Sequence, residues 1–293
     1  MGSTALVKIK KLLWATDFSN ESTSCLPYIK AISKVLKTRN FALYVLPKFS
    51  DWVYESSVFS SEDLVGEVEK ARAESYRKIE RLAKSKQVDL IPRIEEGVAS
   101  EEIIRVAQES QVQMIFAGRR GISEMEELLI GSTTSRLIRN SPIPVFVVPR
   151  VSRSVSLSKI LVPLDLKDPE LPELQYAIGL ASQLKAELVV VHVAQFFNYK
   201  IPVLERDRLL GGIREKIEQV AGRKRKTIAQ IIFQYGDPAQ KIIETSRKQK
   251  ADLIVIAAHQ RKGIEKLFLG SVAEKVLMVS ETPLLVLPYS HIS

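Results

Sequence analysis

The chain has 293 residues, 45% of them hydrophobic, and a formal net charge of +9 at pH 7. This length accommodates two domains of ordinary size, each with its own core. No apolar run approaches the roughly 20 residues needed to span a bilayer, and the first residues lack the apolar core of a signal peptide. A single cysteine, Cys25, excludes an internal disulfide and suits a reducing compartment. We therefore expect a cytoplasmic protein that does not contact a membrane.

The first half of the sequence alternates apolar strands with helices. Short unbroken apolar runs are typical of strands in a parallel sheet that is covered on both faces. The expected elements, in chain order, are a strand at 11–17, a helix at 22–37, a strand at 43–46, a helix at 63–86, a helix opening near 99, a strand at 112–117, a helix at 134–140 and a strand at 144–148.

The most informative motif is Gly118-Arg-Arg-Gly121, followed after nine residues by Gly131-Ser132-Thr133. Glycines at a strand end let the backbone pass close to a ligand. A Gly-Ser-Thr at a helix start offers amide N–H groups, hydroxyls and the positive end of the helix dipole. These parts predict an anion site, most economically a phosphate site. The spacing is neither that of a Walker loop nor that of the dinucleotide Gly-x-Gly-x-x-Gly.

The sequence repeats itself. An apolar strand ends in Asp17 in the first copy and in Asp165 in the second, and Leu43-Tyr-Val-Leu46 matches Val191-His-Val-Ala194. A Gly-Ser pair recurs at 270–271. This repetition predicts two tandem domains, 1–150 and 151–293, each a doubly wound α/β domain with a five-stranded parallel sheet of Rossmann-like type. Ligands of such sheets bind at the carboxyl ends of the strands, where Asp17 and the glycine motif both fall.

The combination resembles the universal stress protein (UspA) superfamily in its tandem two-domain form, and the resemblance covers nearly the whole chain. It is carried by Thr16-Asp17-Phe18-Ser19, by Gly118-x2-Gly121-x9-Gly131-Ser132 and by the strand that begins at Pro144. In that family, this glycine spacing is associated with members that bind ATP. The resemblance therefore implies an adenine nucleotide, ATP or AMP, with or without Mg²⁺.

The resemblance also implies a role for residues at the nucleoside end of the site. Asp17 would lie near the nucleoside with Ala15 beside it, and Val45 would meet the adenine through its backbone. The alternative for Asp17, independent of any ligand, is a loop aspartate that accepts hydrogen bonds from nearby backbone amides.

At the phosphate end, the resemblance implies that Gly118 and Gly121 let the loop wrap the ribose and phosphates. Gly131, Ser132 and Thr133 would bind phosphate oxygens through N–H and hydroxyl groups, although the family usually has valine where Thr133 stands. The arginines between the first two glycines could also reach a triphosphate. A solvated loop tip is the equal alternative for them.

The second copy departs from the pattern. Ala257 and Gln260 occupy the places of the first two glycines, whereas Asp165 and Val193 remain. A glutamine adds a side chain near the ligand path, where a bare backbone is favoured. We therefore expect nucleotide binding in the first copy only.

Two further segments have competing interpretations. The basic tetrad 223–226 could bind nucleic acid, but no nucleic-acid module accompanies it, so a solvated helix end is the preferred interpretation. The first copy carries extra residues, which we place at 48–64, with an aromatic group of Trp52, Tyr54 and Phe59. This insertion either packs on its own domain or forms a lid or partner surface.

The sequence offers no catalytic residues and no metal site that we would name. It lacks a nucleophile paired with a base, and its three histidines have no spacing typical of metal ligands. We expect a stress-response module that binds a nucleotide without turning it over quickly. The alternatives are a slow ATPase or phosphotransferase and a protein-interaction scaffold. The resemblance further implies that the two copies pair through their fifth strands, and we expect a homodimer.

Overall fold

The computed structural model describes residues 8–48, 61–120, 130–149, 155–166, 171–194, 203–258 and 270–288. The chain divides into two compact units, one formed by Lys8–Val151 and one containing Ser152–Ser293. They are called here the N-terminal and the C-terminal domain, and each is described by itself. The greater part of the aromatic insertion, 49–60, lies outside the described residues.

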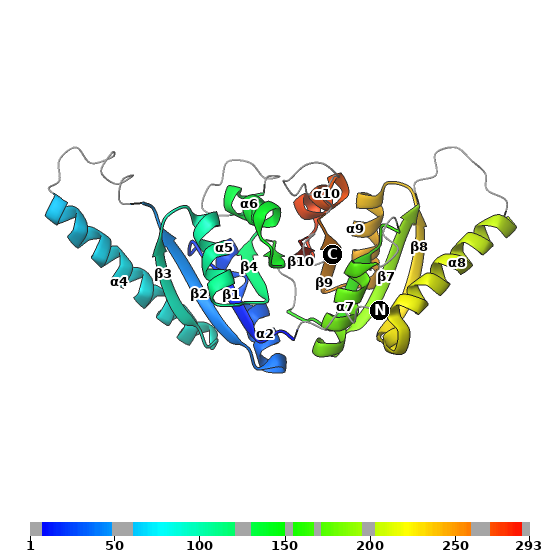
Figure 1. Cartoon of the computed structure of the whole chain (residues 1–293), viewed down its shortest axis with the longest axis horizontal. Helices are drawn as coiled ribbons and strands as arrows, with labels where there is room; N and C mark the ends of the chain where they lie inside the picture. The colour runs from blue at the N-terminus through cyan, green and yellow to red at the C-terminus, as the bar shows by residue number, and fades with distance from the viewer. Residues whose placement is uncertain are drawn as a thin grey trace. The chain divides into compact units, whose positions relative to one another are not determined.

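The N-terminal domain is a doubly wound α/β sheet (Figure 1). Its strands are all parallel and follow the order β3-β2-β1-β4-β5. Because the chain moves outward from β1 in both directions, right-handed connections place α2 and α4 on one face and α5 and α6 on the other. The elements are β1 (Lys11–Ala15), α1 (Asn20–Thr23), α2 (Leu26–Leu36), β2 (Arg39–Leu46), α4 (Ser61–Lys86), β3 (Ile91–Glu96), α5 (Ala99–Glu109), β4 (Met114–Gly118), α6 (Ser132–Asn140) and β5 (Val145–Val148).

The C-terminal domain repeats this arrangement, with parallel strands in the order β10-β9-β6-β7-β8. The predicted fold class, a doubly wound parallel α/β sheet in each of two tandem domains, is confirmed. The elements are β6 (Lys159–Pro163), α7 (Pro172–Leu184), β7 (Glu187–Ala194), α8 (Val203–Ala221), the 3₁₀ helix η1 (Gly222–Thr227), β8 (Ile228–Tyr235), α9 (Pro238–Gln249), β9 (Leu253–Ala257), α10 (Ser271–Val279) and β10 (Leu284–Leu287).

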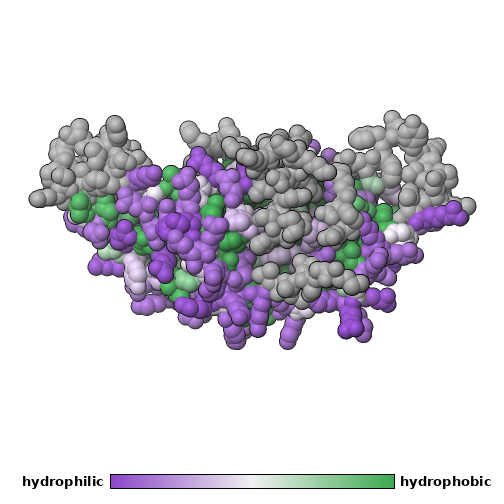
Figure 2. Space-filling view, in the orientation of Figure 1, coloured by the Kyte–Doolittle hydropathy of each residue, from purple (hydrophilic) through white to green (hydrophobic). Residues whose placement is uncertain are grey.

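The unbroken apolar runs follow from burial on both faces of the sheet. Every residue of β4 and β5 is buried, as expected for strands of a parallel sheet that is covered on both faces. The core of the N-terminal domain contains Trp14, Phe116 and Phe146, all fully buried, and the two phenylalanine rings stack 4.6 Å apart. The face of the described residues shown in Figure 2 is correspondingly mostly hydrophilic.

Two elements differ from the sequence-based expectation. The helix expected at 22–37 is two helices, because Ser19 caps a separate short helix, α1, and α2 begins only at Leu26. Strand β3, which was not placed from the sequence, contains Pro92. Proline is tolerated there because β3 is an edge strand of this domain's sheet. Among the described residues, none of the helices combines the length and apolar character required to cross a bilayer.

Candidate nucleotide-binding site

A cleft of about 230 Å³ lies at the carboxyl ends of β1, β2 and β4, beside the start of α6. This is the place where the strand order reverses, and it is where open α/β sheets bind their ligands. Seven of the eight residues predicted from the sequence line it, whereas Gly121 lies outside the described residues. The seven are Ala15, Asp17, Val45, Gly118, Gly131, Ser132 and Thr133.

Asp17 has a local structural role as well as a place in the cleft. Its Oδ1 accepts hydrogen bonds from the backbone N–H of Ser19 at 3.0 Å and from the Ser19 hydroxyl at 2.6 Å. The Ser19 hydroxyl in turn accepts from the N–H of Ser22 at 3.1 Å and so caps α1. The interpretation of Asp17 as a loop residue that binds local amides is therefore confirmed for one oxygen. Within the described ranges the second oxygen has no hydrogen-bond partner, and the side chain lines the cleft.

Helix α1 is held against the cleft wall by contacts that the sequence analysis did not predict. The Trp14 indole donates from Nε1 to the Ser22 carbonyl at 2.8 Å, and the hydroxyls of Thr16 and Ser22 lie 3.0 Å apart. Thr16 and Ser22 also line the cleft. Phe18 follows with a φ of 63°, a left-handed conformation that is uncommon for an aromatic residue. The repeated strand-end aspartate gave no signal for these contacts, because they depend on how α1 folds back on β1.

Gly118 has a packing role in addition to the ligand contact that the resemblance implies. A Cβ at this position would lie 2.7 Å from the backbone carbonyl carbon of Glu21 and 2.9 Å from the backbone nitrogen of Ser22. The absence of a side chain therefore lets α1 approach the end of β4. The Gly118 carbonyl also accepts a hydrogen bond from the Thr134 hydroxyl at 2.7 Å, which joins β4 to α6.

The start of α6 presents unsatisfied donors to the cleft. Gly131 is its N-cap residue, with φ −56° and ψ 144°, and no side chain caps the helix. Within the described part of the chain, the backbone N–H groups of Ser132, Thr133 and Thr134 have no acceptor. Arg120 lines the same cleft. Orphan amides at the positive end of a helix, with a guanidinium nearby, are suited to bind an oxyanion.

Burial shifts the pKa of three groups at or near the cleft, and Asp17 adds to the shift of two of them. Burial raises the pKa of the Tyr44 hydroxyl, and the negative charge of Asp17 raises it further. The same two causes raise the pKa of the Cys25 thiol, which is fully buried, so Cys25 is an unreactive core residue. Burial lowers the pKa of Arg119, and the neighbouring Arg120 lowers it further. In the ranges that the structure describes, no three His, Cys, Asp or Glu side chains gather to hold a metal ion.

The C-terminal domain retains only part of this arrangement. Gly270 caps α10 with φ −58° and ψ 149°, close to the values at Gly131. Ala257 ends β9 where Gly118 ends β4. Ala273 stands where Thr134 would be, so the hydroxyl that joins the strand end to the helix is absent. Gln260 lies outside the described residues.

These features define a protein with two Rossmann-like α/β domains, one of which has a polar cleft headed by the amino terminus of a helix. The model of the Universal stress protein family matches residues 8–149 and 157–288. The chain belongs to this family.

Two sequence relatives and a solved structure, all universal stress proteins, are similar to this chain. The chain is 32% identical over 136 residues to Universal stress protein MJ0531 of Methanocaldococcus jannaschii, covering 44% of this chain and 80% of that protein. It is 28% identical over 159 residues to Universal stress protein MJ0577 of the same organism, covering 49% and 97%. A crystal structure of a universal stress protein from Archaeoglobus fulgidus matches 95% of this chain and 98% of its own, with a TM-score of 0.71 and 20% identity, which shows a shared fold.

Proposed function

We propose that the N-terminal domain binds an adenine nucleotide, ATP or AMP, and that the protein acts as a nucleotide-binding module of the stress response in the cytoplasm. The observation that carries this proposal is that one cleft contains seven residues to which the family resemblance assigns nucleotide contacts. These residues come from four separate elements and the loops that follow them, so their convergence depends on the fold.

The chemistry of the cleft supports a ligand with an apolar end and an anionic end. Leu43, Ile103 and Leu137 supply apolar wall, and the Val45 backbone lies at the end of β2, where it can meet the adenine. The α6 amides and Arg120 lie at the phosphate end.

The test uses purified full-length protein and a matched pair of variants. Mass spectrometry of small molecules released from the protein should find an adenine nucleotide, and added ATP with Mg²⁺ should raise the melting temperature. Binding at 100 times Kd stabilises the folded state by about 2.7 kcal/mol. Ser132→Asp places a negative charge at the phosphate end and should abolish both signals, whereas the equivalent Ser271→Asp in the C-terminal domain should leave them intact. The absence of any nucleotide together with no thermal shift would refute the proposal.

Slow hydrolysis or phosphotransfer is a second candidate, and one observation favours it. Asp17 lines the cleft, Ser19 occupies only one of its carboxylate oxygens, and Mg²⁺ prefers oxygen ligands such as carboxylates. Phosphate release that disappears in Asp17→Ala, while nucleotide binding persists, would establish this activity. If the two are lost together, Asp17 acts through binding or through α1.

We also propose an assembly, on the family resemblance and the tandem repeat. The domains, taken as 1–150 and 151–293, would pair through their fifth strands, β5 and β10, and the chain would form a homodimer. Light scattering of the purified protein should then give twice the chain mass of 32.9 kDa. A mass of one chain would exclude the homodimer while leaving the pairing of the domains untouched.

A further inference from the structure

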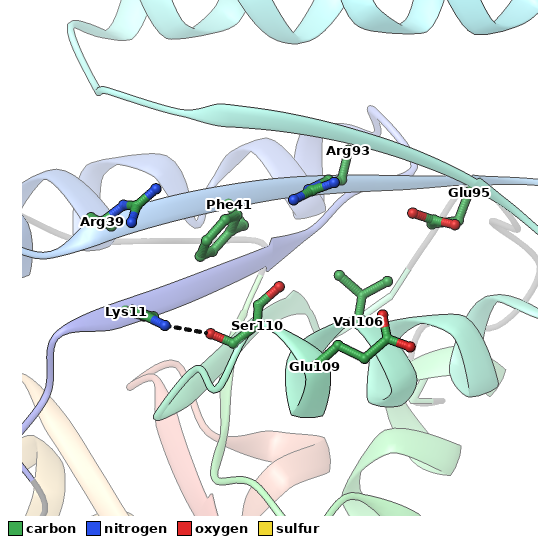
Figure 3. A pocket seen from close by; sticks show the side chains of 8 residues that line it. All are labelled: Lys11, Arg39, Phe41, Arg93, Glu95, Val106, Glu109 and Ser110. Atoms are coloured by element: carbon green, nitrogen blue, oxygen red, sulfur yellow. Dashed lines mark hydrogen bonds between the residues drawn. The ribbon is translucent and has the colours of Figure 1, made fainter.

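A second cavity lies on the face of the N-terminal sheet that α5 covers (Figure 3). It encloses about 270 Å³ and shares no lining residue with the nucleotide cleft. Lys11 and Arg39 stand at the amino-terminal starts of β1 and β2, so this cavity is near the opposite ends of those strands from the nucleotide cleft. Its floor includes Phe41, which is only 6% exposed.

Three cationic side chains from three adjacent strands line the cavity. Lys11 donates from Nζ to the Ser110 carbonyl at 2.9 Å, and the Arg39 guanidinium lies 5.9 Å from the centre of the Phe41 ring. Within the described residues, neither Arg39 nor Arg93 has a carboxylate partner. Figure 3 shows the side chains of Arg39 and Arg93 on either side of the Phe41 ring. Both arginines are exposed, so a ligand from solution can reach them.

The acidic side chains at the cavity form ion pairs with an arginine that does not line it. Arg105 on α5 holds Glu95 at 2.8 Å and Glu109 at 2.8 Å, and it also contacts Glu102 at 2.7 Å. Its hydrogen bonds to Glu102 and Glu109 raise the pKa of Arg105, so it stays charged. These carboxylates therefore pair with Arg105 rather than with the three cations of the cavity. The four cationic and three acidic side chains together leave a net charge of +1 at the cavity.

The C-terminal domain shows the same position without a cationic cluster. Lys11 and Arg39 are register partners on neighbouring strands, which places like charges side by side at a cost in stability. Their counterparts Lys159 and Glu187 are also register partners, and they form an ion pair at 3.6 Å. The C-terminal domain therefore has a cation and an anion at this pair of positions, whereas the N-terminal domain has two cations.

The counterpart of Arg93 is also uncharged. Arg93 pairs in register with Leu43 on β2, and Leu43 matches Val191 of the repeat. Val191 pairs in register with Ile232, which therefore occupies the place of Arg93. Two of the three cations in the cavity are consequently particular to the N-terminal domain.

We propose that this cavity is a second anion site, which binds a small phosphate-bearing anion between Lys11, Arg39 and Arg93. Guanidinium groups present paired N–H donors that match phosphate oxygens, and an ammonium adds a point charge. The bound anion would relieve the repulsion between Lys11 and Arg39. The cavity volume suits inorganic phosphate, pyrophosphate or a small phosphomonoester. The site does not depend on nucleotide binding in the cleft.

The test is a titration of the full-length ¹⁵N-labelled protein with inorganic phosphate, pyrophosphate and glycerol phosphate, followed by amide chemical shifts. Saturable shifts at Arg39, Phe41, Arg93 and Ser110 are expected with at least one of these three anions. The anion that binds most tightly shows whether the site takes free phosphate, a diphosphate or a phosphomonoester. Shifts at the start of α6 would report the nucleotide cleft separately, so failure at one site is distinguishable from failure at the other.

Two charge-reversal variants decide whether the cluster is responsible. Arg39→Glu reproduces the Lys159–Glu187 pair of the repeat and is therefore compatible with the fold. It should weaken binding at least tenfold and remove the shifts around the cavity. Lys34→Glu makes the same charge change at an exposed position of α2 that does not line the cavity, and it should leave binding within twofold of the original. No saturable shift at the cavity with any of the three anions, or equal losses in both variants, would overturn the proposal.

Discussion

Replacing Gly118 with alanine separates a role in folding from a role in ligand contact. The added Cβ would lie 2.7 Å from the carbonyl carbon of Glu21 and 2.9 Å from its oxygen. Both atoms are backbone, so no side-chain rotation relieves the contact, and α1 must move away from β4. The displacement also affects the hydrogen bond from Trp14 Nε1 to the Ser22 carbonyl at 2.8 Å.

The expected loss follows from these contacts. Overpacking of a closely packed site costs about 1–3 kcal/mol, and a hydrogen bond contributes about 1 kcal/mol. We therefore expect Gly118→Ala to lower the free energy of unfolding of the N-terminal domain by about 2–4 kcal/mol. Nucleotide affinity should fall with it, because Asp17 is tied to the start of α1 through Ser19.

The assay is urea unfolding followed by the fluorescence of Trp14, which is fully buried beside α1. A Trp52→Phe background leaves Trp14 as the sole tryptophan of the chain. Gly66→Ala is the matched control, because a Cβ on Gly66 in helix α4 meets nothing within 4 Å. It should stabilise the domain by about 0.4–1 kcal/mol. If Gly118→Ala unfolds like the original protein but loses nucleotide, the glycine serves the ligand and the reasoning is refuted.

Three other predictions concern charge and burial. The pKa of Tyr44 lies above its ordinary value of 10.0, so the folded domain keeps a proton that the unfolded chain releases, and stability should fall as the pH rises above 10.0. In Asp17→Asn the pKa of Tyr44 should fall but stay above 10.0, because the burial of the hydroxyl persists. Carbon-13 NMR of labelled tyrosine measures this pKa. An unchanged value would contradict the contribution assigned to Asp17. Tyr176→Phe should raise the free energy of unfolding by about 1 kcal/mol in urea titrations, because the buried Tyr176 hydroxyl has no hydrogen-bond partner among the described residues. A lower free energy of unfolding would show that the hydroxyl has a partner. Arg105→Gln should weaken pyrophosphate binding at the second cavity, because it releases Glu95 and Glu109 from their ion pairs with Arg105. The same amide-shift titration measures this. Unchanged binding would mean that those carboxylates do not face the anion.

Much of the fold and most of the candidate site could be predicted from the sequence, because both depend on local patterns. Unbroken apolar runs gave the parallel strands, and the repeated strand-end aspartate gave the two domains. Asp17 follows β1, and Gly131 precedes α6 in the connection after β4. Because parallel strands end at the same edge of a sheet, the sequence predicted that these two residues lie close together. For this reason seven of the eight predicted residues line one cleft in the structure.

The tertiary structure decided what each residue does at that edge. The sequence explained Gly118 by a ligand, whereas the fold shows that α1 packs where its side chain would be. The cluster of Lys11, Arg39 and Arg93 had no sequence signal, since its members are far apart along the chain and meet only through the register of β1, β2 and β3. Local periodicity determines which face of a strand is buried. Contacts between distant segments, and clusters of charged side chains from several strands, exist only once the sheet has formed.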